Sequence, residues 1–320
     1  MKIGLIDVDG HNFPNIVLMK LSAYHKSKGD TVEWYDPMFS SDMDIVYMSK
    51  IFSFTEDYIY PIRAKKIIKG GSGYCIQTIN GIEVYDKEKD IQLAEEVEHI
   101  YPDYSIYESL TKDTAYGYLT RGCPRNCAFC HVADKEGRKS YKCANLSEFW
   151  NGQKFIKLLD PNILAYKGHL DLLQQLADSK AYVDFTQGLD IRLISDANIN
   201  LINQIKIKEI HFAWDNPNHD LRPYFSNYKE KAKHKPHGQY GTVYILVNFG
   251  SDIGEDLYRI YTLRDLGYDP YVMVYDKQNA PQIKRDLQRW CNNRFIFKKC
   301  KDFRDYKRSG IDESKKADVF

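Results

Sequence analysis

The sequence predicts an α/β protein built from two domains. Its 320 residues suit two domains at roughly 150 residues each. Short apolar runs alternate with amphipathic segments, which is the pattern of strands and helices in series. The runs are closely spaced in the first hundred residues and roughly 27 to 39 residues apart afterwards, so the two parts differ in architecture.

The first part begins with a strand, a helix and two further strands. The apolar run from Lys2 to Val8 suits a buried parallel strand. From Asn15 to Lys28, apolar residues recur on one helical face, and Gly29 is suited to end that helix. Strands are expected at 31–35 and 44–48.

A second helix is expected from Tyr58 to Lys69, ended by the glycines of 70–73. Strand and helix in this alternation predict a doubly wound, Rossmann-like sheet. We assign residues 1–110 to this domain, because the pattern weakens between about 85 and 112 into surface and linker sequence.

The second part, residues 111–308, repeats a longer strand-and-helix unit six times. This repetition predicts a partial (β/α)6 barrel of the TIM type, with chemistry at the carboxyl ends of its strands. A seventh strand could lie at 294–297, and residues 309–320 form a polar C-terminal tail. The six strands are expected to begin near Tyr116, Phe155, Tyr182, Glu209, Val243 and Tyr271.

Composition excludes several classes of protein. The 45 Lys and Arg residues nearly cancel the 44 Asp and Glu residues, and the net charge of +1 does not suit a bulk polyanion binder. The longest strongly apolar run, 243–247, is far shorter than the ~20 residues of a membrane helix. Asp7 interrupts the start where a signal peptide is apolar. We therefore expect a cytoplasmic protein without a membrane partner.

Three cysteines within eight residues are the strongest chemical signal. Cys123, Cys127 and Cys130 have the spacing C-x3-C-x2-C and directly follow the first strand of the second part. Thiolates are soft ligands suited to iron–sulfur clusters or zinc. A structural zinc site needs four ligands. His131 adjoins the last cysteine and is badly placed for the same metal, whereas Cys143 could serve, so zinc stays an alternative.

This motif, with the aromatic residue Phe129 before its last cysteine, resembles the signature of the radical S-adenosylmethionine (radical SAM) superfamily. The flanking stretches 120–123 and 130–137 resemble the branch with an N-terminal Rossmann-like, B12-binding-like domain. Methylthiotransferases of that branch carry further cysteines in this domain for a second cluster. This chain has only Cys75 there, which disfavours methylthiotransferase activity.

The resemblance implies a [4Fe–4S] cluster on the three cysteines, with one iron open to S-adenosylmethionine (SAM). It further implies reductive cleavage of SAM to a 5′-deoxyadenosyl radical that modifies a substrate, which the sequence does not identify. A low-potential electron donor such as flavodoxin or ferredoxin is the expected partner. The catalytic residues beyond the cluster ligands are not predicted.

The resemblance also implies that polar residues at the strand ends hold SAM. Asp160 would accept from the ammonium, in place of the Gly-Gly-Glu of many members, and Arg192 would hold the carboxylate. The alternative is that strand-end Asp and Asn cap helices, and that Arg192 pairs with Asp190 or Asp196. The expected cofactor-binding residues, besides Phe129, are Asp160, Asn162, Gln187, Arg192, Asp215 and Asn248.

Cobalamin is a further candidate cofactor. Asp9-Gly-His11, 49–51 and Gly70-Gly71 follow the order of the cobalamin-binding pattern, in which the histidine ligates cobalt. The first element ends in Pro14 rather than glycine, so His11 could equally be an ordinary loop residue. A cobalamin-assisted radical SAM methyltransferase is therefore an alternative function.

An alternative of another class is a zinc-stabilised module that binds nucleic acid. Basic residues gather at 229–237, and they mix with aromatic residues at 298–308, as in proteins that track a single strand. The near-zero net charge instead favours solvated charged faces at both segments.

Overall fold

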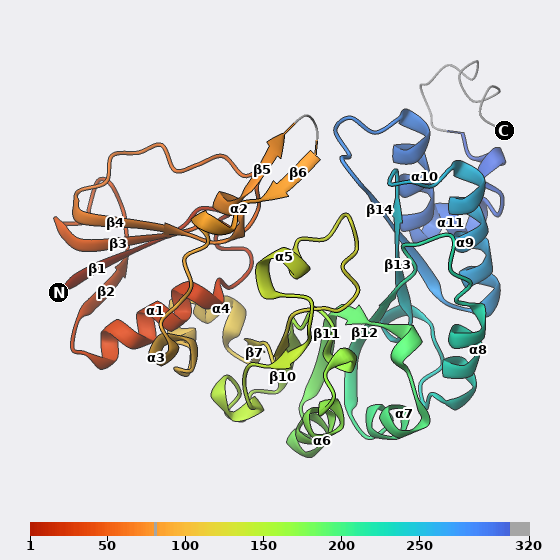
Figure 1. The fold of residues 1–320 in the computed structure, drawn as a ribbon, viewed down its shortest axis with the longest axis horizontal. Coiled ribbons are helices and arrows are strands. Elements are labelled where there is room, and N and C mark those ends of the chain that lie inside the picture. Colours follow the sequence, from red (N-terminus) through yellow and green to blue (C-terminus); the bar gives the residue numbers. More distant parts are fainter. Residues whose placement is uncertain (80–81, 308–320) are drawn as a thin grey trace. The chain divides into compact units, whose positions relative to one another are not determined.

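The computed structural model describes residues 1–79 and 82–307, and it is an α/β fold with two parallel sheets (Figure 1). The chain divides into two compact units, Met1–Pro161 and Asn162–Phe320. Among the described residues, no helix has the length and apolar character needed to cross a membrane. The predicted tail, 309–320, lies outside the described residues, and so does residue 308 at the end of the predicted barrel.

The first sheet has four parallel strands in the order β2-β1-β3-β4. Helix α1, Ile16–Ser27, packs against it (Figure 1), and the Asn15 side chain caps the helix by accepting from the Leu18 amide. Ile3 and Leu18 belong to the core between sheet and helix. The strands are β1 (Lys2–Asp7), β2 (Thr31–Trp34), β3 (Met43–Ser49) and β4 (Ala64–Gly70).

The expected helix from Tyr58 to Lys69 is wrong, because its second half is strand β4. Most side chains of this edge strand are exposed. Its sequence therefore lacks the alternation of apolar and polar residues that marks a strand with one buried face. Its pairing with β3, from Met43 opposite Ala64 to Ser49 opposite Gly70, decides the conformation. The glycines at 70–71 therefore end a strand rather than a helix.

The rest of the first unit consists of short elements. Two antiparallel pairs, β5 with β6 and β8 with β9, accompany four short helices. The strands are β5 (Ile76–Ile79), β6 (Ile82–Tyr85), β8 (Thr120–Arg121) and β9 (Tyr141–Lys142). The helices are α2 (Ser72–Cys75), α3 (Glu95–Glu98), α4 (Glu108–Thr111) and α5 (Val132–Glu136).

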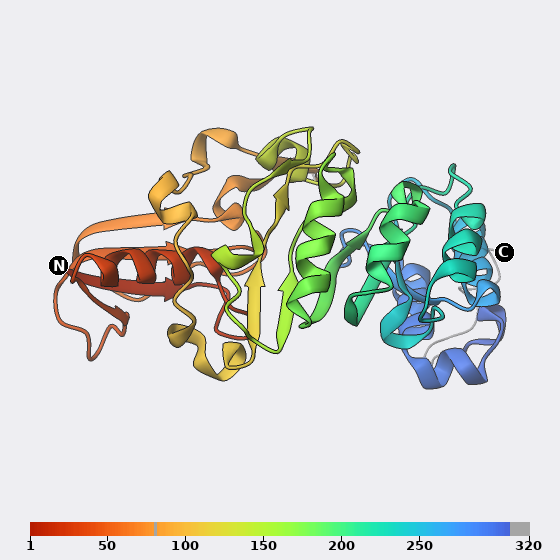
Figure 2. The same ribbon diagram turned by 90° about the horizontal axis from the view of Figure 1, so that it is seen from below.

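The second sheet has six strands in the order β14-β13-β12-β11-β10-β7, and every expected strand of the second part is present. They are β7 (Thr114–Gly117), β10 (Phe155–Leu158), β11 (Tyr182–Leu189), β12 (Lys206–Ala213), β13 (Thr242–Val247) and β14 (Asp269–Val274). Helices alternate with the later strands, and Figure 2 shows the green helices α6 and α7 in front of them. These helices are α6 (His169–Ser179), α7 (Asp196–Ile202), α8 (Arg222–Lys231), α9 (Ile253–Leu266) and α10 (Gln282–Asn292).

The seventh strand expected at 294–297 is wrong, because this segment is the start of helix α11, Arg294–Lys299. Its Phe-Ile-Phe run has the composition of a strand. The Asn293 side chain, however, accepts from the amides of Phe295 and Ile296, and this cap begins a helix. A local side-chain hydrogen bond thus overrides the strand propensity.

The expected domain boundary near residue 110 falls in α4, whereas the two compact units meet at Pro161 and Asn162. Within the first unit, Tyr104 donates to the Phe149 carbonyl at 2.6 Å, and Tyr107 donates to Asp7 at 2.6 Å. These bonds join the segment that follows the first sheet to its neighbours on both sides. The division at residue 110 stays a prediction.

Candidate functional site

The three clustered cysteines lie on one loop between β8 and α5, shortly after β7. Cys123, Cys127 and Cys130 are each partly exposed, and no disulfide joins any of the described cysteines. The Cys130 amide donates to the Cys127 carbonyl at 2.9 Å, which closes a turn between the last two. Asn126 adopts a positive φ of 47°, so the loop also reverses between the first two. Phe129 is partly buried in the same loop.

Backbone contacts to the end of α5 fix the start of this loop. The Gly122 amide donates to Glu136 Oε2 at 2.9 Å, and the Cys123 amide donates to the Gly137 carbonyl at 3.2 Å. Arg121 pairs with the other Glu136 oxygen at 3.1 Å. The loop is therefore folded back on α5 before its first thiol.

Position 122 accepts only glycine. Gly122 has a φ of +77°, where side chains are strained. A Cβ at this position would also lie 2.3 Å from the Lys139 carbonyl oxygen. The backbone at Gly122 and the backbone at Lys139 therefore pack closely at the start of the cysteine loop.

Cys143, the candidate fourth zinc ligand, is held by contacts to the backbone of Tyr118 and Leu119. Its amide donates to the Leu119 carbonyl at 2.9 Å, and its thiol contacts the Tyr118 carbonyl at 3.5 Å. Burial raises the pKa of the Cys143 thiol to about 12, and metals bind the thiolate. His131 instead lies 3.3 Å from Glu83 through its Nε2. His131 is thus engaged by Glu83, and zinc with Cys143 as its fourth ligand stays a prediction.

Asp160 anchors the segment that leads into the cysteine loop. Its side chain is buried and accepts from the Leu119 amide, the Thr120 amide at 2.5 Å and the Thr120 hydroxyl at 2.7 Å. Burial raises the pKa of this carboxyl to about 6, against these hydrogen bonds, which lower it. The expected ammonium contact would have to share oxygens that already accept backbone bonds.

Arg192 forms the ion pair that the sequence offered as an alternative. Its Nε lies 2.7 Å from Asp190 Oδ1 and its Nη2 3.2 Å from Oδ2, a bidentate arrangement. Asn162 donates to the same carboxylate at 3.5 Å. The structure thus brings Asn162 and Arg192 together around Asp190. Gln187 lies exposed on β11.

Asp215 and Asn248 follow β12 and β13. Asp215 accepts from the Leu246 amide at 3.0 Å, and burial raises the pKa of this carboxyl. Asn248 donates to the Tyr275 carbonyl at 2.8 Å and has a φ of +65°. Both side chains are therefore used to hold strand ends, while each stays partly exposed.

A buried arginine fixes these strand ends. Arg259 on α9 is fully buried and donates to the carbonyls of Trp214 and Asp215 at 2.8 Å and of Leu246 at 3.1 Å. Its charge is paired with Asp256 at 2.6 Å. Carbonyls that would otherwise need water at the end of the sheet are thus satisfied from one guanidinium.

The cobalamin-like elements lie at one edge of the first sheet. Asp9 accepts from the amides of Ile51 and Phe52, and a Cβ on Gly71 would lie 2.3 Å from the Lys50 carbonyl oxygen. His11 is exposed, and its ring lies 4.2 Å from that of Trp34 at 35°. The three sequence elements are therefore neighbours, with His11 packed on an aromatic ring.

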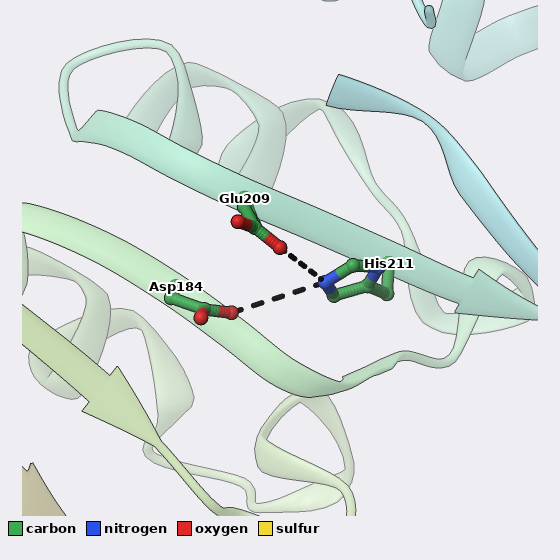
Figure 3. Close-up of side chains that lie close together, drawn as sticks. All are labelled: Asp184, Glu209 and His211. Carbon is green, nitrogen blue, oxygen red and sulfur yellow. Dashed lines mark ion pairs between the residues drawn. The ribbon is translucent and has the colours of Figure 1, made fainter. Parts of the chain in front are cut away.

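One cluster of ligand-type side chains was not predicted from the sequence. Asp184 on β11 and Glu209 and His211 on β12 turn their polar atoms toward one another, within 4.8 Å (Figure 3). The available signal was the presence of charged residues inside two strand-like apolar runs. Comparison with known proteins adds no assignment: no family model matches the chain, and no curated protein is significantly similar to it.

Proposed function

We propose that this protein is a radical SAM enzyme whose [4Fe–4S] cluster is held by Cys123, Cys127 and Cys130. The observation that carries the proposal is the placement of three thiols on one short loop shortly after β7, a strand of a six-stranded sheet. We infer that this sheet is a partial (β/α)6 barrel and that the first sheet is Rossmann-like, as in the family branch that the motif resembles.

The residues present fit such a cluster. Three soft thiolates on a single loop suit iron–sulfur ligation, and a loop of this length offers no fourth cysteine to close the coordination. The chemistry supplied by the bound cluster is one-electron reduction of SAM to methionine and a 5′-deoxyadenosyl radical.

The chain's own residues orient this chemistry. Glu136 and Gly137 hold the start of the loop through the amides of Gly122 and Cys123. Asp160 fixes the approach to the loop, because it accepts from the amides of Leu119 and Thr120. In unit two, Asp190 engages Arg192 through Nε and Nη2, and the SAM carboxylate contact expected of Arg192 stays a prediction. The substrate is not identified. From the sequence we propose that the protein acts in the cytoplasm.

Serine substitution tests the ligand assignment. After anaerobic cluster reconstitution, the wild-type chain should hold about four irons and release methionine from SAM under a low-potential reductant such as reduced flavodoxin. Cys127→Ser should lose both iron and SAM cleavage. Cys300→Ser is the matched control, because Cys300 is also partly exposed and its thiol donates to the Asp302 carbonyl at 3.0 Å, far along the chain from the cysteine loop.

The outcomes separate the proposed function from its rivals. A Cys127→Ser variant with wild-type iron and SAM cleavage would refute the assignment. Zinc without iron in the reconstituted wild-type chain would instead favour the zinc-stabilised module. Cobalamin retained by the wild-type chain but lost in His11→Ala would favour the methyltransferase, which the proximity of Asp9, 50–52 and Gly71 supports.

A further inference from the structure

Two carboxylates and an imidazole meet on neighbouring strands of the second unit. Asp184 on β11 lies directly opposite Glu209 on β12, and His211 follows two residues later on the same face. His211 Nε2 is 3.4 Å from Glu209 Oε2 and 3.9 Å from Asp184 Oδ1 (Figure 3). One nitrogen and two oxygens therefore converge on one point.

The cluster lies on the sheet face opposite the helices. Phe212 packs its ring against Phe225 and Tyr228 of α8, so its neighbour His211 points to the other face. The Asp184 and His211 side chains are 3% and 10% exposed, while Glu209 is 42% exposed. The point of convergence is thus buried on two sides and reachable from the third.

The charges call for a cation. Two carboxylates this close to each other in a partly buried site destabilise one another when both are ionised. A protonated His211 would leave one negative charge over, whereas a dication with a neutral imidazole leaves none. Carboxylate oxygens and imidazole nitrogen are together a donor set of divalent transition metals.

The distances also suit a metal rather than hydrogen bonds. The distances from His211 Nε2 to the Glu209 and Asp184 oxygens both exceed the 2.7–3.2 Å typical of hydrogen bonds. Ligands at 2.0–2.2 Å around a tetrahedral ion stand about 3.3–3.6 Å apart, close to the 3.4 and 3.9 Å observed here. The imidazole is held in place by Tyr244, whose ring stacks on it at 5.2 Å and 18°.

A second observation points to a small ligand at this place. Thr186 lies two residues after Asp184, its carbonyl accepts from the hydroxyl of Tyr244, whose ring stacks on His211, and its own hydroxyl is buried. Its Oγ1 forms no hydrogen bond with any residue that the structure describes. Such a group calls for a water or ligand oxygen, as an open metal position would hold.

We propose that Asp184, Glu209 and His211 bind one zinc-type divalent transition-metal ion, with at least one coordination position left for water or an anionic oxygen. This site consists of residues outside the cysteine loop. It does not depend on the proposed cluster.

Cobalt titration of the full chain, freed of metal with a chelator, tests the proposal. Co²⁺ substitutes for zinc, and its visible bands separate oxygen and nitrogen ligation from thiolate ligation, which adds a charge-transfer band. We expect one Co²⁺ per chain with oxygen and nitrogen ligation, present also in Cys127→Ser. Asp184→Asn and His211→Gln should weaken it by at least about 100-fold, since even losing a hydrogen-bond partner of a ligand costs 10–100-fold.

Two controls keep the result interpretable. Glu230→Gln removes an exposed acid of α8 and should bind Co²⁺ like the wild type. The melting temperature of metal-free Asp184→Asn, compared with that of the metal-free wild type, shows whether the variant still folds. No saturable oxygen and nitrogen ligation, or ligation unchanged in Asp184→Asn, would overturn the proposal. A Cys127→Ser chain without the cobalt signal would do so too, while loss of iron alone in that variant concerns only the cluster.

Discussion

Replacing Gly122 by alanine tests how the cysteine loop is held, without touching a thiol. An alanine Cβ would lie 2.3 Å from the Lys139 carbonyl oxygen, where contacts below 3.0 Å essentially do not occur. The backbone must therefore separate by about 0.7 Å, the difference of these two distances. Positive φ costs about 1–2 kcal/mol for a non-glycine residue, and overpacking adds about 1–3 kcal/mol. We expect a loss of about 2–5 kcal/mol.

The matched control is Gly152→Ala, in the same unit. Gly152 has a φ of +87°, similar to the +77° of Gly122, but nothing lies within 4 Å of its Cβ position. It should therefore lose only the conformational part, about 1–2 kcal/mol. Urea unfolding measures the free energies, and iron content after reconstitution should fall in Gly122→Ala more than in Gly152→Ala. Equal stability and equal iron in the two variants would refute the account of the loop.

Three further predictions concern the surroundings of the site. Arg259→Leu leaves three strand-end carbonyls without their donor, while Asp256 keeps its ion pair with Lys284 at 2.5 Å, and should cost at least about 1–3 kcal/mol in urea unfolding; a cost below 1 kcal/mol would contradict the clamp on the strand ends. The raised pKa of Asp160, about 6 against 3.8, gives a stabilisation that is fully present below pH 3.8 and lost as pH rises through 6. The unfolding free energy of the wild type minus that of Asp160→Asn should therefore fall by about 2 kcal/mol between pH 4 and 7, and a flat difference would show that Asp160 keeps an ordinary pKa. Cys143→Ser should retain wild-type iron, and iron analysis showing its loss would make Cys143 a ligand.

The fold was predictable where local signals and burial agree. For α1, the Asn15 cap, the apolar face and Gly29 all indicate the same helix, and the six strands of the second sheet are short runs that each contain buried apolar side chains. The prediction fails at β4 and α11 for opposite reasons. β4 is an exposed edge strand whose conformation comes from its partner β3, and α11 is a strand-like run turned into a helix by Asn293.

Only those parts of the candidate site whose residues are close together in the sequence were predictable. The three cysteines share one loop, so their grouping follows from spacing alone. The partners of Arg192 could be narrowed to nearby acids, and Asp190 is the one used. Asp184 and Glu209 could not be paired from sequence, because the register of β11 against β12 shifts next to Asp184 and only the fold sets it.

The central claim is an iron–sulfur cluster with one iron open to SAM, and low-temperature EPR tests it most directly. The anaerobically reconstituted and reduced wild-type chain should hold about four irons and give a reduced [4Fe–4S] signal. Adding SAM should change that signal, because SAM would bind the iron that no cysteine holds. A signal unaffected by saturating SAM, or a chain that holds zinc and no iron, would contradict the claim.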